Sequence, residues 1–301
     1  MSATPIYQVG SRDVRVLSDG VIWLDAGAVF GLVPKIMWQR VTGETNELNQ
    51  IPLALNCLLL QSDDKTVLIE TGQGNKDFEQ TRRRGWEPDH GKLIEDLARN
   101  GVQPADVDIV INTHLHNDHT GWNTIEHGDG DLAVTFPNAR YYIQRGEWED
   151  AMHPNERTRA TYLPENLLPV EAAGQVEFID GETQITSDIT VIETPGHTAE
   201  HASVVIANGG ESAIYLGDMI QHQVQLERIA WLSAFDVLPL INLETKKRLI
   251  ADAIEHQSLL VAVHNPFPGV GRLSAGERGR NVWSSEEPHA LVETTDAVPA
   301  D

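Results

Sequence analysis

The sequence predicts a layered α/β sandwich built as a single domain. Short apolar runs of strand length recur along most of the 301 residues, helical patterns separate only some of them, and no internal repeat is present. Strict alternation of strand and helix would indicate a doubly wound parallel sheet, so its absence favours layered sheets with helices outside. We expect this domain to cover residues 1–283.

The first half of the chain contains strands that we expect to pair with their neighbours. Residues 13–24 read as two short strands around a central Asp-Gly pair, which predicts a β-hairpin. Two further strands, at 54–60 and 66–70, flank a polar turn. A helix is expected over 90–100, because its apolar residues fall on one face and Gly101 follows.

The second half of the chain supplies the remaining expected elements. Residues 242–257 have apolar side chains in helical register and predict a long helix. The expected strands cover residues 107–112, 140–144, 176–179, 189–193, 202–206, 213–216 and 259–263. Residues 284–301 are acidic and contain few large apolar side chains, so we expect a disordered tail.

The composition argues against several classes of partner. With Lys+Arg 22 against Asp+Glu 45, the formal net charge is -23. Such a surface repels phosphate backbones and anionic lipids, so nucleic-acid and membrane-surface roles are not expected. No apolar run reaches the length of a membrane span and no secretory signal is recognised, so a cytoplasmic protein is expected. The single cysteine, Cys57, lies in an apolar run and is expected to be a buried thiol.

Residues 26–50 form a long, irregular segment that is rich in large apolar side chains, including Phe30 and Trp38. An exposed apolar patch of this size is uncommon on a monomer. We therefore expect the segment to pack across a homodimer interface or to cover the active-site cleft as a lid. Trp38 is a candidate for contact with substrate, with core packing as the alternative.

The segment Asn112-Thr-His-Leu-His-Asn-Asp-His-Thr-Gly-Trp122 carries the strongest functional signal. His114 and His116 are two positions apart, so in an extended backbone they point the same way. Asp118 and His119 follow a turn and approach from another side. Imidazoles with a carboxylate are the ligands that suit zinc and its first-row neighbours. The pattern therefore predicts a metal site, and solvated loop histidines are the alternative.

Three more candidate ligands follow buried strands elsewhere in the chain. His197 comes after the strand at 189–193, and Asp218 and His264 come directly after two other expected strands. A rigid sheet can place a side chain accurately at such a position. Taken alone each residue has a structural alternative, as a cap or a hydrogen-bonded histidine. Together with the cluster they predict enough ligands for two metal ions.

At these residues the sequence resembles the metallo-β-lactamase superfamily, whose signature is His-x-His-x-Asp-His at the end of a strand. The resemblance runs from about Val14 to about Arg272 and implies an αββα sandwich with a dinuclear metal site at one edge. It implies one metal bound by His114, His116 and His197, a second bound by Asp118, His119 and His264, and Asp218 bridging both. Zinc is the expected metal, with Mn²⁺, Co²⁺ or Fe²⁺ as alternatives.

Two polar residues are expected behind the ligands. The run Thr66-Val-Leu-Ile-Glu-Thr-Gly72 is similar to a family strand that ends in Asp-Thr-Gly, with Glu70 in place of the usual aspartate. The resemblance implies that Glu70 contacts a ligand histidine. His201, four positions after His197, is expected to support a ligand, with a purely structural role as the alternative.

The resemblance also narrows the branch of the superfamily. A bridging aspartate such as Asp218 is typical of glyoxalase-II-like thioesterases, N-acyl homoserine lactonases and methyl-parathion-hydrolase-like enzymes, whereas β-lactamases proper generally lack it. The stretch His264-Asn-Pro-Phe267 most resembles the lactonase and organophosphate-hydrolase branch. Phe267 and Gln221 are therefore candidate substrate-binding residues, although quorum-quenching lactonases usually carry a tyrosine where Gln221 stands.

The expected activity is hydrolysis of a small-molecule ester-like bond, most readily a lactone, by a hydroxide that bridges the two metals. Asp118 or His222 would pass a proton to the leaving group. A purely structural role is the alternative for His222. The competing hypotheses are a phosphotriester hydrolase, a thioesterase, a β-lactamase, a redox diiron protein and a non-catalytic metal module.

Overall fold

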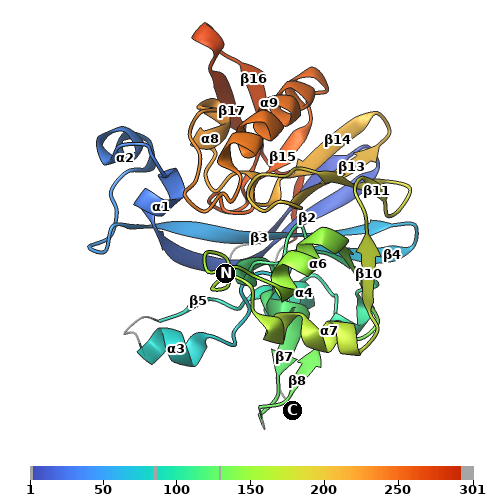
Figure 1. Cartoon of the computed structure of the whole chain (residues 1–301). Coiled ribbons are helices and arrows are strands. Elements are labelled where there is room, and N and C mark those ends of the chain that lie inside the picture. Colours follow the sequence, from blue (N-terminus) through green and yellow to red (C-terminus); the bar gives the residue numbers. More distant parts are fainter. Residues whose placement is uncertain (1–2, 84–86, 129, 293–301) are drawn as a thin grey trace.

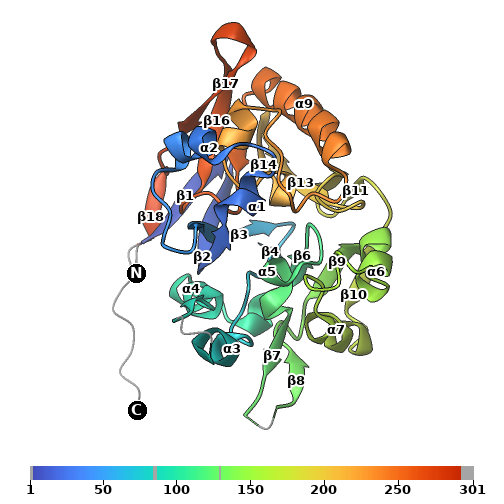
Figure 2. The same cartoon turned by 60° about the vertical axis from the view of Figure 1, so that its left-hand side comes forward.

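The structure, a computed structural model, describes residues 3–83, 87–128 and 130–292. Within these ranges two large β-sheets pack face to face, and helices cover both outer faces (Figure 1). The predicted layered α/β sandwich is confirmed, and its order of layers is αββα. Figure 2 shows the same layers from another side, with α9 beyond one sheet and α6 and α7 beyond the other.

The first sheet is mixed, with a parallel part and an antiparallel part. In the described residues its order is β10-β9-β6-β4-β3-β2-β1-β18, with β5 paired to β2. The pairs β10/β9, β9/β6 and β6/β4 are parallel and the others are antiparallel. The strands are β1 (Thr4–Val9), β2 (Arg12–Asp25), β3 (Gln50–Ser62), β4 (Lys65–Ile69), β5 (Asp89–His90), β6 (Ile109–Ile111), β9 (Arg140–Gln144), β10 (Val176–Ile179) and β18 (Ala290–Val292).

The second sheet is antiparallel except where β14 runs parallel to β15. Its order in the described residues is β11-β12-β13-β14-β15-β16-β17. The strands are β11 (Thr183–Gln184), β12 (Ile189–Glu193), β13 (Ala202–Asn208), β14 (Glu211–Tyr215), β15 (Leu259–Val261), β16 (Val270–Ala275) and β17 (Asn281–Ser285). A separate hairpin is formed by β7 (Thr124–Glu126) and β8 (Leu132–Val134).

The main hydrophobic core lies between the two sheets. Alternate side chains face it, as Leu58 and Leu60 do from β3 and Val204 and Ile206 do from β13. The side chains between them, such as Leu59, point to the outer face of the first sheet. Each sheet is therefore buried on both faces, which explains its nearly continuous apolar runs.

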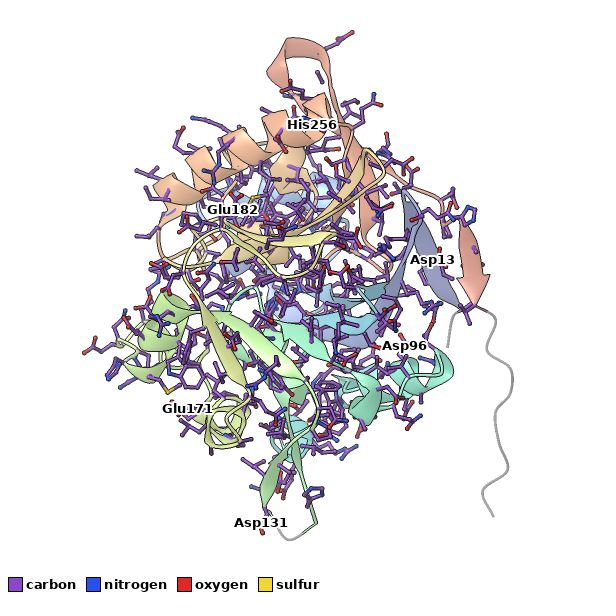
Figure 3. The ribbon with its side chains drawn as sticks, turned by 90° about the vertical axis from the view of Figure 1, so that its right-hand side faces the viewer. Asp13, Asp96, Asp131, Glu171, Glu182 and His256 are labelled. Carbon is purple, nitrogen blue, oxygen red and sulfur yellow. The ribbon has the colours of Figure 1, made fainter. Side chains whose placement is uncertain are left out.

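Helices complete the outer layers. The first sheet is covered by α4 (Leu93–Arg99), α6 (Arg145–Met152) and α7 (Leu168–Ala172), and the second by α9 (Pro239–Glu255). Glu171 on α7 and His256 beyond the end of α9 mark these opposite sides in Figure 3. The shorter helices are α1 (Ala26–Phe30), α2 (Lys35–Thr42), α3 (Phe78–Arg83), α5 (Asn117–Thr120) and α8 (Val224–Glu227). None of the described helices combines the length and hydropathy needed to cross a bilayer.

The expected hairpin at residues 13–24 is wrong. β2 runs through this region as one strand, and its register with β3 shifts only between Ser18 and Val21. The Asp19 carboxylate, which is fully buried, accepts hydrogen bonds from the backbone N–H groups of Gln73, Gly74 and Leu93 and from the indole of Trp122. These distant partners hold the Asp-Gly pair in a bulge, so no turn forms there.

Two other expectations differ from the structure. Residues 26–50 are not irregular throughout, because α1 and α2 form within them. The expected disordered tail is wrong for residues 284–292: β17 ends at Ser285, and β18 pairs with β1 through Thr4 and Val292. Backbone pairing at a sheet edge does not require large apolar side chains, which is why composition missed it. Residues 293–301 of that tail lie outside the described residues.

Candidate metal centre

The histidine cluster begins where β6 ends at the edge of the first sheet. His114 and His116 lie in the extended loop after β6, and His116 has φ -64 and ψ 154 as the residue before α5. Asp118 and His119 lie in the single turn of α5. The backbone changes from extended at His116 to helical in α5, and this brings the His119 ring to 4.1 Å from the His114 ring.

The structure brings all seven predicted ligands together. Donor atoms of three residues within each of two trios lie within 4.8 Å of one another. The first trio is His114, His116 and His197, and the second trio is Asp118, His119 and His264. These are the groupings that the sequence analysis assigned to the two metals. A third group, Glu70 with His114 and His119, meets the same distance criterion.

Asp218 lies between the two trios. Its Oδ1 is 2.9 Å from Nε2 of His264 and 3.2 Å from Nε2 of His119, and its Oδ2 is 3.3 Å from Nε2 of His197. It sits in the turn Gly217–Met219 that follows β14, and it is buried. One carboxylate oxygen therefore faces the second trio and the other faces the first, which is the arrangement a bridging ligand needs.

The donor atoms fit divalent cations. Nε2 of His114, both ring nitrogens of His119 and Oδ1 of Asp218 are buried, and among the described residues none of them makes a well-aligned hydrogen bond. Buried polar atoms without partners are costly, and a cation coordinated by them would remove that cost. Burial and the neighbouring His119 hold the pKa of His114 well below its usual range, so this ring is neutral, as a metal ligand must be.

The charge of Asp218 shifts the pKa of the neighbouring ligand histidines, and they shift its pKa in turn. Burial favours its neutral form, but His264, His119 and His197 outweigh burial and hold the pKa of this carboxyl well below its usual range. Burial lowers the pKa of His264, but the charge and hydrogen bond of Asp218 together with the charge of Asp118 outweigh it, so the net pKa is raised. A buried carboxylate that draws protons onto the surrounding imidazoles would equally attract a cation in their place.

Glu70 and His201 lie where the sequence analysis expected supporting residues. Oε1 of Glu70 accepts the Thr113 N–H at 2.7 Å, and its Oε2 is 3.3 Å from Nδ1 of His119. Nε2 of His201 accepts the Asp218 N–H at 2.9 Å. Glu70 thus orients a ring of the second trio, and His201 fixes the backbone of the bridging residue.

Two buried carboxylates of the site were missed by the sequence analysis. Asp236 contacts His197, with Oδ1 3.3 Å from Nδ1 of the ring. Glu147 on α6 accepts hydrogen bonds from Leu115 and Thr198, which are neighbours of ligand residues. Neither carries a local signal: Asp236 lies in an irregular segment, and Glu147 stands among other acidic residues of its helix.

A cavity of about 610 Å³ opens over the candidate ligands. His116, Asp118, His197, Asp218 and His264 line it, together with Gln221. Its apolar lining consists of Val21, Ile22, Trp23, Leu24, Leu48, Phe235 and Val237. The rest of the lining is mostly polar and includes Gln73, Asp77, Glu87, Asp89, His90 and Arg157.

Three of the candidate residues do not line this cavity. Trp38 is 2% exposed and stacks on Phe30 with ring centroids 5.6 Å apart, so it belongs to the core beneath α2. Phe267 packs against the core between the sheets. His222 contacts Phe30 edge-on and accepts the Val224 N–H, and burial lowers its pKa to about 4. The structure therefore gives no support to substrate contact by Trp38 or Phe267, or to proton donation by His222.

An αββα sandwich with two histidine-rich trios at the ends of its strands defines a class of metal-binding proteins. Comparison with known families agrees: a model described as metallo-beta-lactamase superfamily matches residues 51–264. The chain belongs to the metallo-β-lactamase superfamily.

Relatives with named activities match this chain at low sequence identity. An N-acyl homoserine lactonase of Bacillus cereus is 29% identical over 168 residues, which are 52% of this chain and 60% of the relative. A Bacillus sp. N-acyl homoserine lactonase is 28% identical over 166 residues, 52% of this chain and 59% of its own length. The chain thus spans about three fifths of the lactonases that it matches.

Solved structures match over nearly the whole chain. A probable metal-dependent hydrolase from Staphylococcus aureus is 26% identical with a TM-score of 0.81, covering 97% of this chain and 100% of that one. AidC, a dizinc quorum-quenching lactonase, is 21% identical with a TM-score of 0.77, covering 95% of this chain and 98% of its own; at that identity it shows the fold alone.

Proposed function

We propose that the chain is a dinuclear-metal hydrolase that cleaves an ester-like bond, most readily that of a lactone. The observation that carries this proposal is the position of Asp218, whose two carboxylate oxygens face the two trios at 2.9 to 3.3 Å. The relatives that are named as N-acyl homoserine lactonases support the choice of a lactone.

The two trios and Asp218 would hold two divalent cations. Five imidazoles and two carboxylates suit zinc, and Mn²⁺, Co²⁺ and Fe²⁺ accept the same donors. When bound, such ions lower the pKa of water and polarise a carbonyl oxygen. Asp218 would share its negative charge between them and fix their separation.

Asp118 is the residue of this chain best placed to move a proton. Its side chain is 16% exposed and lines the cavity, whereas the ligand histidines of its trio are almost fully buried. Its Oδ2 lies 3.6 Å from Nε2 of His264, so it reaches both the second trio and the cavity. A carboxylate in this position can hold a proton and deliver it to a leaving alkoxide.

The walls of the cavity would orient the substrate. The apolar lining from β2, Leu48 and Phe235 suits a substrate with an apolar arm, because burying that arm removes apolar surface from water. Gln221 also lines the cavity, and its side-chain amide donates to the carbonyl oxygen of Asp218 at 3.0 Å. The reacting group would then sit over Asp218 with the arm along β2.

A substrate panel tests this function. The metal-loaded protein is assayed with lactones, aryl esters, phosphotriesters, thioesters and β-lactams, and the values of kcat/KM are compared. Lactones should give the highest kcat/KM, removal of metals by a chelator should abolish turnover, and zinc, cobalt or manganese should restore it. A higher kcat/KM for phosphotriesters would favour an organophosphate hydrolase at the same site. No metal-dependent turnover of any ester would contradict the proposal.

We further propose that the chain forms a homodimer through α1, α2 and the loop that follows. This segment exposes Leu32, Ile36, Met37, Val41 and Leu48, and Leu32 is 102% exposed. Apolar side chains exposed in such numbers within one segment are better buried against a second copy than left in water. Because Leu48 also lines the cavity, the partner would lie close to the cavity mouth.

A further inference from the structure

Glu147 lies on α6 and is 1% exposed. Its Oε1 accepts the Leu115 N–H at 3.0 Å and the Tyr162 hydroxyl at 3.0 Å, and its Oε2 accepts the Thr198 hydroxyl at 2.6 Å. Three donors from three different segments therefore converge on one carboxylate. Burial raises the pKa of Glu147, whereas these donors favour its ionised form.

Two of the three partners of Glu147 are immediate sequence neighbours of ligands in the first trio. Leu115 directly precedes His116, and Thr198 directly follows His197. One carboxylate thus joins the loop after β6 to the loop after β12. Nδ1 of His116 lies 3.1 Å from Nε2 of His197, so a small shift between these loops would change the separation of the two donor atoms.

Tyr162 adds a contact to the same trio. Its ring lies 5.1 Å from the His116 ring, while its hydroxyl donates to Glu147. Glu147 therefore holds the backbone before His116 and also the aromatic ring that packs against the His116 imidazole. Both contacts restrict the orientation of one ligand.

The second trio has supports of its own. Nδ1 of His264 lies 2.8 Å from the carbonyl oxygen of Ala54 on β3, and Glu70 lies beside His119. Glu147 makes none of these contacts in the described residues. Two ligands of the second trio, His264 and His119, thus have contacts that do not involve Glu147.

We propose that Glu147 is a positioning residue that sets the metal affinity of His114, His116 and His197 and leaves that of the second trio unchanged. This inference rests on the proposed placement of two metals, and not on the identity of the substrate. In Glu147→Gln only one side-chain oxygen can accept, so the NH₂ group would either face the Leu115 N–H or force the Thr198 hydroxyl to turn from donor to acceptor, and the negative charge is lost in both cases.

The test measures metal binding without activity. Metal-free wild type and Glu147→Gln are titrated with Zn²⁺ against a chromophoric chelator and with Co²⁺ by visible absorption, while thermal unfolding shows that each is folded. One of the two binding constants should fall about 10- to 100-fold in Glu147→Gln, and the other should stay unchanged. Thr198→Val, which removes only the link to the loop of His197, should reproduce part of the loss.

Two further substitutions test whether the loss of affinity belongs to the first trio and to Glu147. His264→Ala leaves only the first trio complete, and adding Glu147→Gln to it should weaken the remaining metal to the same degree. Asp188→Asn is the matched control: Asp188 is another buried carboxylate, which bonds with Arg12, Ser62 and Asn208, so both constants should stay at wild-type values.

Equal losses at both sites, or unchanged constants in a folded Glu147→Gln, would overturn the inference. A wild-type chain that binds a single metal would also overturn it, since the inference requires two metal sites that respond differently to the loss of Glu147. Two metals bound without any ester hydrolysis would contradict the proposed function alone; in that case the titration constants still decide the role of Glu147.

Discussion

Oδ1 of Asp236 lies 3.3 Å from Nδ1 of His197, on the edge of the ring opposite to the one that faces Asp218. The His197 imidazole is therefore held between two carboxylates. Asn242 donates to Oδ2 of Asp236 at 2.9 Å and keeps that carboxylate oriented. A carboxylate behind a ligand histidine fixes its tautomer and its direction.

Asp236→Asn should weaken the metal bound by the first trio by about 10- to 100-fold, because the amide cannot both accept from Asn242 and hold the ring as a carboxylate does. Equilibrium titration of the metal-free variant with Zn²⁺ measures this loss. Asn242→Ala, which leaves Asp236 charged, should lose less affinity. Wild-type affinity in Asp236→Asn would show that the contact does not influence binding.

Asp218→Asn should lose metal and activity together. The substitution keeps the volume but removes the charge that would be shared by two cations, so both ions bind more weakly. Elemental analysis of the purified variant and its kcat measure the two losses. If it retains two metals per chain and near-normal turnover, the bridging assignment is wrong.

His201→Ala tests the hydrogen bond to the Asp218 backbone without changing the Asp218 charge. The substitution removes the acceptor of the Asp218 N–H but leaves every proposed ligand in place. We expect two bound metals with activity lowered by about 10- to 100-fold. Loss of metal as large as that of Asp218→Asn would mean that His201 does more than fix the backbone.

Lys246→Met should change how stability depends on pH. Burial lowers the pKa of Lys246 from its usual 10.5 to about 8, and Asp236 opposes this shift. Between pH 8 and 10.5 the unfolded chain therefore binds a proton that the folded chain does not, so this residue adds stability as pH rises through that window. Relative to Lys246→Met, the wild-type Tm should increase from pH 7 to pH 10.

The comparison of these two Tm values cancels the titration of other groups. The methionine leaves the carbonyl oxygens of Gln225 and Trp231 without the Nζ donor, a cost that does not vary with pH. A Tm difference that stays constant from pH 7 to pH 10 would show that Lys246 titrates at its ordinary pKa in the folded protein.

Leu32→Asp should convert the proposed dimer to a monomer, because it places a charge in the apolar face of the segment around α2. Sedimentation at several protein concentrations measures the mass. The matched control is Leu168→Asp, another exposed leucine at 44%, on α7. A monomeric wild type would contradict the proposed interface.

The parts of the site that the sequence predicts are those with short-range spacing. His114, His116, Asp118 and His119 lie within six positions, and the strand before them fixes their directions. His197 and Asp218 could be found because ligands that follow buried strands meet at one sheet edge. Asp236 could not, because it lies 39 positions after His197 in an irregular segment, and only the tertiary fold brings the two together.

Residue type alone also could not tell which aromatic side chains lie in the core and which line the cavity. Trp38 and Phe267 are as apolar as Trp23 and Phe235, yet only the latter two line the cavity. The bulge at Asp19 shows a similar effect in the fold. The Asp-Gly pair favours a turn locally, but four hydrogen bonds from distant segments override that preference.

The pairing of β18 with β1 has a practical consequence for handling the protein. β18 occupies the outer edge of β1, so it covers backbone groups that would otherwise be free to pair with another chain. A chain shortened to end at Ser285 would keep the metal site and the sandwich core but expose that edge. Removal of residues 286–292 should therefore promote aggregation, and a C-terminal purification tag should be attached beyond residue 292.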